Sequence, residues 1–439
     1  MTERYSQPRT VAVTGLGTIN SAGNNVKDYW DAVTSGRREG IITNERAWLL
    51  AQTPDTYHKK LRSSLIGRVK SDDLAGDLLA LEELAYQHFD RKYIDRYLSE
   101  SAILGAIAAA EAMRDAKAHR AVDPKRLAFV LGTGIGGGIE ISTYQSVMEA
   151  GGSLPATGMP KTQPENAMIQ LAIAYGAKGP SRTLTAACSS GNAAIIDATQ
   201  KIRNDKADMV VAGGVEGFDP LILALFERTG AADTGEDPST ASRAFHPEAG
   251  GAVVSEGASV LVLEELEHAK ARGATVFAIV AGIGETNDAS DATLLTGEGI
   301  EDAMRLSLNE ATVTGEDYIH VSAHATSAQK GDPVERDAIL RVFGNGEYSL
   351  DQIERRVVAL KSITGHALGA ANGSEAVAAV KTLVEQKLPP STWLADGVIK
   401  GMDDLVTNTC VAEVLPVDVA ISNGMGFGGQ NTSVVFRSY

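Results

Sequence analysis

Short, mostly apolar runs that end at a glycine or another small residue alternate along this chain with longer stretches of helical periodicity. Five of these runs are Thr10–Gly15, Leu127–Gly132, Met209–Gly214, Val276–Gly282 and Ile319–Ala323. Near-continuous apolar runs are typical of strands that helices cover on both faces. Their alternation with helices predicts an α/β fold. No Pro- or Ser-rich linker separates two domains.

One arrangement of strand, turn and helix occurs twice in the sequence. The first copy, Arg182–Arg203, carries Cys188 in its turn, and the second copy, Val357–Gln386, carries His366. The identity between the copies is low, but the shared order of elements predicts a duplicated α/β unit. Two segments richer in charged and polar residues are expected to be insertions or caps over the core: Arg37–Asp95 and Phe226–Ala249.

Composition excludes several classes of protein. A net charge of −16 argues against general nucleic-acid binding, because phosphate contacts need clustered Lys and Arg. No apolar run is long enough to span a bilayer, and the first residues lack the apolar core of a signal peptide. The two cysteines, Cys188 and Cys410, lie far apart in the sequence, form no disulfide framework and suit a reducing compartment. We therefore expect a cytoplasmic protein that binds neither nucleic acid nor a membrane.

Cys188 lies in the run Leu184-Thr-Ala-Ala-Cys188-Ser-Ser-Gly191, where a buried strand is expected to turn into a helix. At a helix N-terminus, unpaired N–H groups and the positive end of the helix dipole lower the pKa of a thiol. The same donors can hold an oxyanion. The alternative is a buried small hydrophobic residue, which most free cysteines are.

Two of the eight histidines, His324 and His366, each follow an apolar strand and sit among small residues. A lone histidine of this kind is usually a satisfied core residue, but two of them beside an activated cysteine favour catalysis. His320 and His324 have the i, i+4 spacing of a zinc pair. Because that segment reads as a strand without an HExxH glutamate or a third ligand, we expect no metal.

Taken together, these motifs resemble the β-ketoacyl-ACP synthases of the elongating Cys-His-His type, close to synthase II. The resemblance runs in order from about Val11 to Phe436. It rests on the Cys188 turn, on His324 in its H-x-T-S…G-D-x-x-E setting, on Lys361 with Thr364-Gly365-His366, and on Asn423-Gly-Met-Gly-Phe427-Gly-Gly-Gln-Asn431. Supporting matches are Val13-Thr-Gly-Leu-Gly17, Ala212-Gly-Gly-Val-Glu216 and Glu256–Gly273.

The resemblance implies a thiolase fold, a duplicated five-layer αβαβα core with caps or insertions. Residues 1–268 would form the N-terminal half, with the nucleophile Cys188, and residues 269–439 the C-terminal half, with His324 and His366. It also implies a homodimer or a heterodimer with a related subunit, and an acyl carrier protein as partner. No cofactor is implied beyond the phosphopantetheine on which that carrier holds the substrates.

The implied activity is that of an acyltransferase in fatty-acid or polyketide chain elongation. Such an enzyme condenses a Cys-bound acyl group with malonyl-ACP in a decarboxylative Claisen reaction that gives β-ketoacyl-ACP. Cys188 would accept the acyl group, and His324 and His366 would stabilise the enolate left when malonyl loses CO2. The backbone N–H groups of Cys188 and Phe427 would form the oxyanion hole.

Supporting roles also follow from the resemblance. Residues that would fix loop geometry and imidazole orientation are Lys361, Asp332, Glu335 and Glu375. Residues that would contact pantetheine or the acyl chain are Thr326, Ile135 and Phe427. Residues that would dock the acidic carrier protein are Arg91, Lys92 and Arg96, for which a solvated helix face is the alternative.

Ile135 lies in Gly132-Thr-Gly134-Ile135-Gly136-Gly137, which also satisfies the dinucleotide pattern GxGxxG. That pattern is weak alone, and here it falls mid-chain in the glycine-rich segment of the family that the sequence resembles. We therefore expect Ile135 to border an acyl pocket.

Several positions depart from the family pattern and leave the pathway open. Ala325 replaces the usual glycine after the first active-site histidine, and Ala328 replaces a second hydroxyl, so Thr326 stands alone. Gly424 and Met425 stand where serine and phenylalanine are common. A primary fatty-acid role and a specialised polyketide role are both compatible with an intact Cys-His-His set.

Two other functions are possible alternatives, and each fits this sequence less well. A non-condensing, chain-length-type partner subunit would usually lack the cysteine that this chain retains at position 188. A thiolase-like enzyme that uses CoA would lack the paired histidines in this arrangement.

Overall fold

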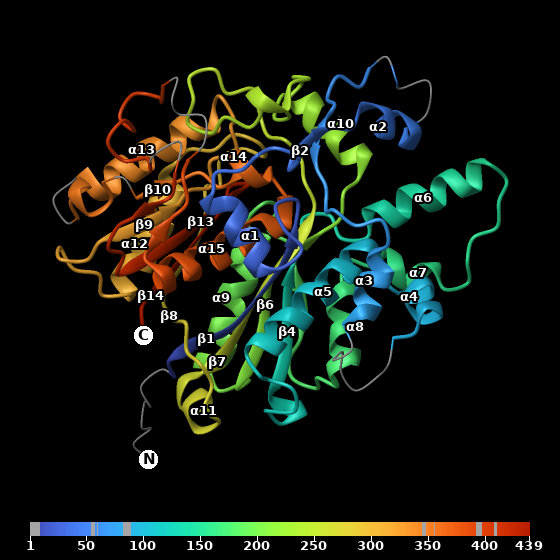
Figure 1. The fold of residues 1–439 in the computed structure, drawn as a ribbon, viewed down its shortest axis with the longest axis horizontal. Helices are drawn as coiled ribbons and strands as arrows, with labels where there is room; N and C mark the ends of the chain where they lie inside the picture. Colours follow the sequence, from blue (N-terminus) through green and yellow to red (C-terminus); the bar gives the residue numbers. More distant parts are fainter. Residues whose placement is uncertain are drawn as a thin grey trace.

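The large sheet consists of two five-strand sets whose strand orders mirror each other about its middle. The computed structural model describes residues 9–53, 58, 60–81, 89–344, 348–354, 356–391, 397–407 and 411–439. Its ten-stranded mixed sheet has the order β10-β9-β13-β14-β8-β1-β7-β6-β4-β5 (Figure 1). The first half of the chain supplies β1 (Val11–Asn20), β4 (Leu127–Gly132), β5 (Arg182–Leu184), β6 (Met209–Glu216) and β7 (Gly257–Glu265). The second supplies β8 (Ala278–Asn287), β9 (Ile319–Ser322), β10 (Val357–Val358), β13 (Val419–Gly426) and β14 (Gln430–Arg437).

The two sets of strands correspond one to one. In the first set β4 runs parallel to β5 and β6, and β7 is antiparallel to β6 and β1. In the second, β9 runs parallel to β10 and β13, and β14 is antiparallel to β13 and β8. A short antiparallel pairing of β1 with β8, from Val11↔Val280 to Val13↔Ala278, joins the halves. The structure thus confirms the expected duplicated α/β core.

Each five-strand set lies between two helical layers. The two sets share the central helical layer, which gives five layers in all. The central helices α9 (Ser190–Arg203) and α15 (Ala371–Glu385) contact strands of both halves. The outer helix α5 (Glu100–Asp115) covers β1 and β7, and α12 (Glu298–Glu310) covers β8 and β14. Figure 1 shows α9 and α15 in the middle, with α12 and α13 on the left and α5 and α8 on the right.

The remaining helices and strands connect or cap these layers. The helices are α1 (Val26–Thr34), α2 (Arg46–Gln52), α3 (Leu74–Ala80), α4 (Arg91–Tyr97), α6 (Gly138–Glu149), α7 (Gly158–Thr162), α8 (Asn166–Tyr175), α10 (Pro220–Thr229), α11 (Leu266–Ala271), α13 (Gly331–Gly344) and α14 (Lys361–Thr364). The short strands are β2 (Ile42–Asn44), β3 (Leu65–Gly67), β11 (Lys387–Leu388) and β12 (Glu413–Val414). No helix in the described ranges has both the length and the apolar character to cross a membrane.

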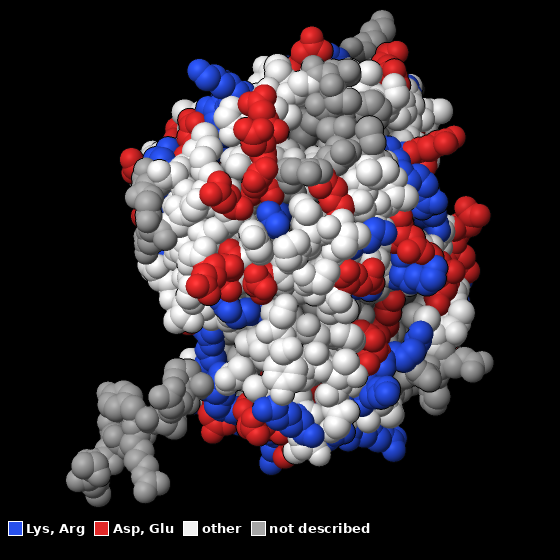
Figure 2. Space-filling model, turned by 60° about the vertical axis from the view of Figure 1, so that its left-hand side comes forward, with Lys and Arg blue, Asp and Glu red and all other residues white. Residues whose placement is uncertain are grey.

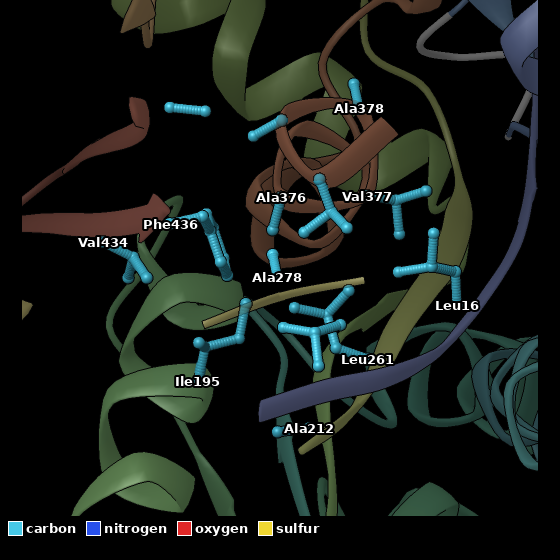
Figure 3. Packing of buried hydrophobic residues seen from close by; sticks show 14 of the residues in the cluster. Leu16, Ile195, Ala212, Leu261, Ala278, Ala376, Val377, Ala378, Val434 and Phe436 are labelled. Atoms are coloured by element: carbon cyan, nitrogen blue, oxygen red, sulfur yellow. The ribbon is translucent and has the colours of Figure 1, made fainter. Parts of the chain in front are cut away.

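Burial on both faces of the strands explains the continuous apolar runs in the sequence. On β7, Leu261 and Leu263 belong to the central core, whereas Val260 and Val262 pack in the outer core with α5. Figure 3 shows the central core, in which Leu261 lies among side chains of both halves, including Ile195 of α9 and Phe436 of β14. Apolar side chains on both faces of each strand are what a sheet between two helical layers requires.

Glycines let the layers approach at equivalent places in the two halves. A Cβ atom at Gly17 of β1 would lie 1.9 Å from the Ala108 oxygen of α5, and one at Gly284 of β8 would lie 2.0 Å from the Ala303 oxygen of α12. The starts of the two central helices also touch, since a Cβ atom at Gly191 would lie 2.9 Å from the Gly373 nitrogen. Only glycine permits contacts this close.

Gly17→Ala should therefore destabilise the fold strongly. The added methyl group meets a helix carbonyl that cannot rotate away, so we expect a loss at the upper end of the usual overpacking range, about 3 kcal/mol. Gly315→Ala is the matched control, because a Cβ atom there meets nothing within 4 Å. Thermal or urea unfolding of both variants measures the difference, and equal stabilities would contradict this packing.

A cap formed by the inserted segment lies over α10. Its α2 and β3 pack in one apolar cluster with α10, to which Leu49, Leu61, Ile66, Phe218 and Leu223 belong. Glu227 of α10 accepts hydrogen bonds from the N–H groups of Arg62 at 2.8 Å and Ser63 at 2.9 Å. The expected insertion at 37–95 therefore covers the core, with residues 54–57, 59 and 82–88 outside the described ranges.

Candidate active site

Cys188 lies in the turn between β5 and α9, as the sequence predicts. The turn is tight: Ala187 has a φ of +49°, in the left-handed region that costs a non-glycine residue strain. Ser190 stabilises the turn, since its hydroxyl accepts a hydrogen bond from the Ala186 N–H at 2.8 Å and lies 3.1 Å from the Thr133 carbonyl oxygen. Cys188 itself is 8% exposed. Cys410, the other cysteine, lies outside the described residues.

The expected lowering of the Cys188 pKa is wrong. Burial raises the pKa of this thiol to about 12, with the Lys361 charge lowering it and the Glu216 charge raising it. The position before α9 was inferred correctly, but desolvation of the thiolate outweighs the helix end. The resting thiol is therefore neutral at pH 7, and its proton must leave as sulfur attacks.

His324 and His366 face each other across the site. His324 follows β9 and His366 follows α14, and their ring centroids lie 5.6 Å apart at an interplanar angle of 88°. Burial lowers the pKa of both imidazoles well below the usual value, and the Lys361 charge lowers both further. Both rings are therefore neutral at pH 7, so each offers one N–H donor and one nitrogen acceptor.

Lys361 ties the His324 loop to helix α15. Its ammonium group donates a 2.7 Å hydrogen bond to the His324 carbonyl oxygen and forms an ion pair with Glu375. Glu375 also accepts a 2.8 Å hydrogen bond from the Asn372 amide. Burial raises the pKa of Glu375 to about 7, against the opposing effect of Lys361. The charge of this ammonium adds to burial in lowering the pKa of both imidazoles.

Two carboxyl groups near the start of α13 hold the loop that follows His324. Glu335 accepts hydrogen bonds from the N–H groups of His324 at 2.7 Å and Ala325 at 2.8 Å, and Asp332 accepts one from Ala328 at 3.2 Å. Burial raises the pKa of Glu335 and that of Asp332, the latter to about 7. Ala325 has a φ of +31°, where the glycine of the family pattern would be less strained.

Phe427 lies beside the Cys188 turn, at the end of β13. A Cβ atom at Gly426 would lie 3.3 Å from the Cys188 nitrogen, so the two backbones are in contact. The Phe427 ring, 37% exposed, stacks on Phe226 of α10 with centroids 5.7 Å apart. Phe226 was not singled out as a site residue, because it sits at the start of a segment that composition marked only as a cap.

Ile135 and Thr326 are both half-buried, in the loops that follow β4 and His324. The Ile135 N–H donates a 3.2 Å hydrogen bond to Glu216, and the Gly369 N–H donates one of 3.0 Å to the same carboxyl group. The Ile135 loop therefore adjoins the turn after His366. In the sequence, Glu216 stands out only as part of a matching motif, although a carboxyl group at the end of an apolar strand can indicate a functional site.

The expected docking residues lie on α4, where the charges are partly paired. Arg91 forms ion pairs with Asp73 and Asp95, both at 2.9 Å, while Lys92 and Arg96 are exposed. Figure 2 brings forward the other side of the molecule, which carries α12 and α13, and shows acidic and basic side chains intermixed there.

His320, one of the two histidines with zinc-pair spacing, contacts the main chain. The Nδ1 atom of His320 lies 3.0 Å from the Arg356 carbonyl oxygen, and burial lowers the pKa of His320 to about 4. Over the described ranges, no three His, Cys, Asp or Glu side chains gather in a way that could hold a metal ion.

Comparisons with known proteins give a consistent result. Residues 8–269 match the model for the N-terminal domain of β-ketoacyl synthases, and residues 277–394 match the model for their C-terminal domain. The chain is 33% identical over 441 residues to 3-oxoacyl-[acyl-carrier-protein] synthase 2 of Synechocystis, with 99% of both chains covered. It is 34% identical to the enzyme of that name from Vibrio cholerae, covering 98% of this chain and 99% of the relative.

Solved structures agree with these sequence relatives. A β-ketoacyl synthase from Burkholderia phymatum superposes with a TM-score of 0.84 at 27% identity, covering 98% of this chain and all of that one. A type II polyketide ketosynthase, bound to its acyl carrier protein, superposes with a TM-score of 0.83 at 27% identity, covering 99% and 100% of the two chains. These matches confirm the thiolase fold expected from the sequence.

Proposed function

Because the chain belongs to the β-ketoacyl synthase family, we propose that Cys188 carries the growing acyl group of a condensing acyltransferase and that His324 and His366 drive loss of CO2 from malonyl. The observation that supports these roles most directly is the pair of neutral imidazoles, 5.6 Å apart and both influenced by Lys361. The reaction needs no cofactor beyond the phosphopantetheine that carries the substrates.

Acyl loading begins with a neutral thiol. Sγ of Cys188 attacks the carbonyl carbon of an acyl-phosphopantetheine thioester while a neutral imidazole nitrogen accepts the thiol proton. The oxyanion that forms is held by the N–H groups of Cys188 and Phe427. The carbon–sulfur bond to pantetheine then breaks, and the proton passes to the departing thiolate. The products are acyl-Cys188 and a free carrier thiol.

Condensation uses the same site with malonyl in place of the acyl carrier substrate. The bond between the malonyl methylene carbon and its carboxylate breaks, and CO2 leaves. The electron pair forms an enolate whose oxygen accepts hydrogen bonds from His324 and His366. The enolate carbon attacks the acyl-Cys188 thioester, the bond between the acyl carbon and sulfur breaks, and the departing thiolate takes up one proton from water. Each half supplies part of this machinery, so we propose that 1–268 and 269–439 act as one catalytic unit.

Mass measurement of the intact protein tests this function. Incubation with acyl-ACP should add one acyl mass at Cys188, and subsequent malonyl-ACP should release CO2 and yield β-ketoacyl-ACP. Absence of acylation would favour the non-condensing chain-length subunit. Acylation from CoA but not from the carrier would favour the thiolase-like alternative.

The proposed partner is an acyl carrier protein, and the assembly a homodimer or a heterodimer with a related subunit. Similar solved structures include a ketosynthase with its acyl carrier protein and the ishigamide ketosynthase/chain length factor. We propose that Lys92 and Arg96 contribute most to carrier docking, because Arg91 is already paired with two carboxylates.

A cytoplasmic location, in which the buried thiol of Cys188 stays reduced, fits the proposed role of the enzyme. Thr326 is the proposed pantetheine contact.

Ile135→Phe should shorten the acyl pocket that we propose beside Cys188. Overfilling an apolar site costs about 1–3 kcal/mol, so long acyl chains should be condensed about ten-fold more slowly while short ones are spared. Ile141→Phe is the control, because Ile141 is 55% exposed on α6. Condensation rates across acyl lengths, together with the melting temperature, give the answer. A uniform loss with a lower melting temperature would remove Ile135 from the pocket.

A further inference from the structure

Glu216 is a buried carboxyl group on which two loops of the site converge. It ends β6, is 1% exposed, and accepts hydrogen bonds from the Thr133 hydroxyl at 3.0 Å and from the N–H groups of Gly134 at 2.6 Å, Ile135 at 3.2 Å and Gly369 at 3.0 Å. Three donors belong to the loop of the proposed acyl pocket, and the fourth belongs to the turn after His366. The mechanism above assigns Glu216 no role.

The two loops touch at this carboxyl group. A Cβ atom at Gly369 would lie 2.2 Å from the Gly134 nitrogen and 2.8 Å from a Glu216 oxygen. Leu368, between His366 and Gly369, has a φ of +46°, so this turn is held in a strained conformation. Four donors converge on Glu216, and two acceptor oxygens are needed to bond them all, which a carboxylate provides.

The Cys188 turn is hydrogen-bonded to the loop that Glu216 holds. The Thr133 hydroxyl, which donates to Glu216, also accepts a hydrogen bond from the Gly136 N–H at 2.9 Å. The Thr133 carbonyl oxygen lies 3.1 Å from the hydroxyl of Ser190, two residues after Cys188. A change in the Ile135 loop therefore reaches the His366 turn through one side chain.

We infer that Glu216 is a positioning residue that couples the wall of the acyl pocket to His366, so that the chain held on Cys188 sets the rate at which malonyl loses CO2. The inference rests on the proposed function, because it needs an acyl group on Cys188 and decarboxylation at His366. A chain long enough to press on Ile135 shifts the loop, and Glu216 transmits that shift to Gly369 and its turn.

Glu216→Gln tests the coupling with almost no change in side-chain volume. Glutamine offers one acceptor oxygen and turns an NH2 group toward N–H donors, so the hydrogen bonds to the two loops cannot all be kept. In the unmodified protein, CO2 release from malonyl-ACP should be faster with a long acyl group on Cys188 than with a short one. In the variant this ratio should fall to about one, with an overall rate about ten-fold lower.

Glu264→Gln is the matched control. Glu264 is also fully buried and hydrogen-bonded, to Thr14, His268 and Arg272, but it lies near the opposite end of the neighbouring strand, where it pairs with Met209 rather than Glu216. That variant should keep the dependence on acyl length, even if its melting temperature falls.

The outcomes are distinguishable. Acyl loading is followed by intact mass, and CO2 release is followed with short and long acyl groups already on Cys188. Loss of the length dependence in Glu216→Gln alone supports the coupling. The same loss in Glu264→Gln, an unchanged ratio in Glu216→Gln, or no length dependence in the unmodified protein overturns it. Failure of the unmodified protein to load or to decarboxylate would instead overturn the proposed function.

Discussion

Cys188→Ala is expected to abolish acyl loading and condensation while the fold persists. The substitution removes the thiol that we propose as the nucleophile, so the rate should fall by at least about a thousand-fold. The loss of one buried atom should cost little stability, because the Ala187 turn is held by backbone and by Ser190 rather than by sulfur.

Intact mass after incubation with acyl-ACP, and chromatography of the β-ketoacyl product, measure this effect. The melting temperature of the variant serves as the control for folding. Normal amounts of β-ketoacyl product from Cys188→Ala would refute the assignment of the nucleophile.

His324→Ala should separate the two half-reactions. Because the oxyanion hole and Cys188 remain, the variant should still accept an acyl group. One of the two N–H donors for the enolate is lost, and removal of such a donor typically costs about 100- to 1000-fold in rate. CO2 release from malonyl-ACP should fall by that factor.

The matched control is His320→Gln, on the strand that leads to His324, because the His320 ring bonds to the Arg356 carbonyl oxygen instead of facing His366. Its CO2 release should stay near that of the unmodified protein. Unchanged CO2 release in His324→Ala, or equal losses in both variants, would contradict the role of His324 in decarboxylation.

The positions of Cys188, His324 and His366 could be predicted because each follows a strand in a short, recognisable motif. The properties of these groups could not, because they depend on residues far away in the sequence. Burial in the folded core raises the Cys188 pKa and outweighs the lowering effect of Lys361, 173 positions later in the chain, so the local helix-terminus argument gave the wrong direction. Local motifs predict where a side chain stands, but only packing determines its charge.

Contacts between distant segments account for the other differences. Arg91 resembled a free docking charge until folding brought Asp73 beside it, and Phe226 became a site neighbour only through its stacking on Phe427. The duplication was visible in the order of elements, whereas the correspondence of all strand pairings required the hydrogen-bond registers. A short stretch of sequence does not determine which distant segment it contacts or in which register two strands pair.

The contact between Gly191 and Gly373 brings the starts of the two central helices together at the reaction centre. Each helix start carries a partial positive charge of about half a unit. In a molecule whose net charge is −16, this main-chain contribution is positive, and it opposes the buried carboxyl groups of Glu216 and Glu375 that lie close by. Because it belongs to the backbone, it stays in place when a single catalytic side chain is replaced.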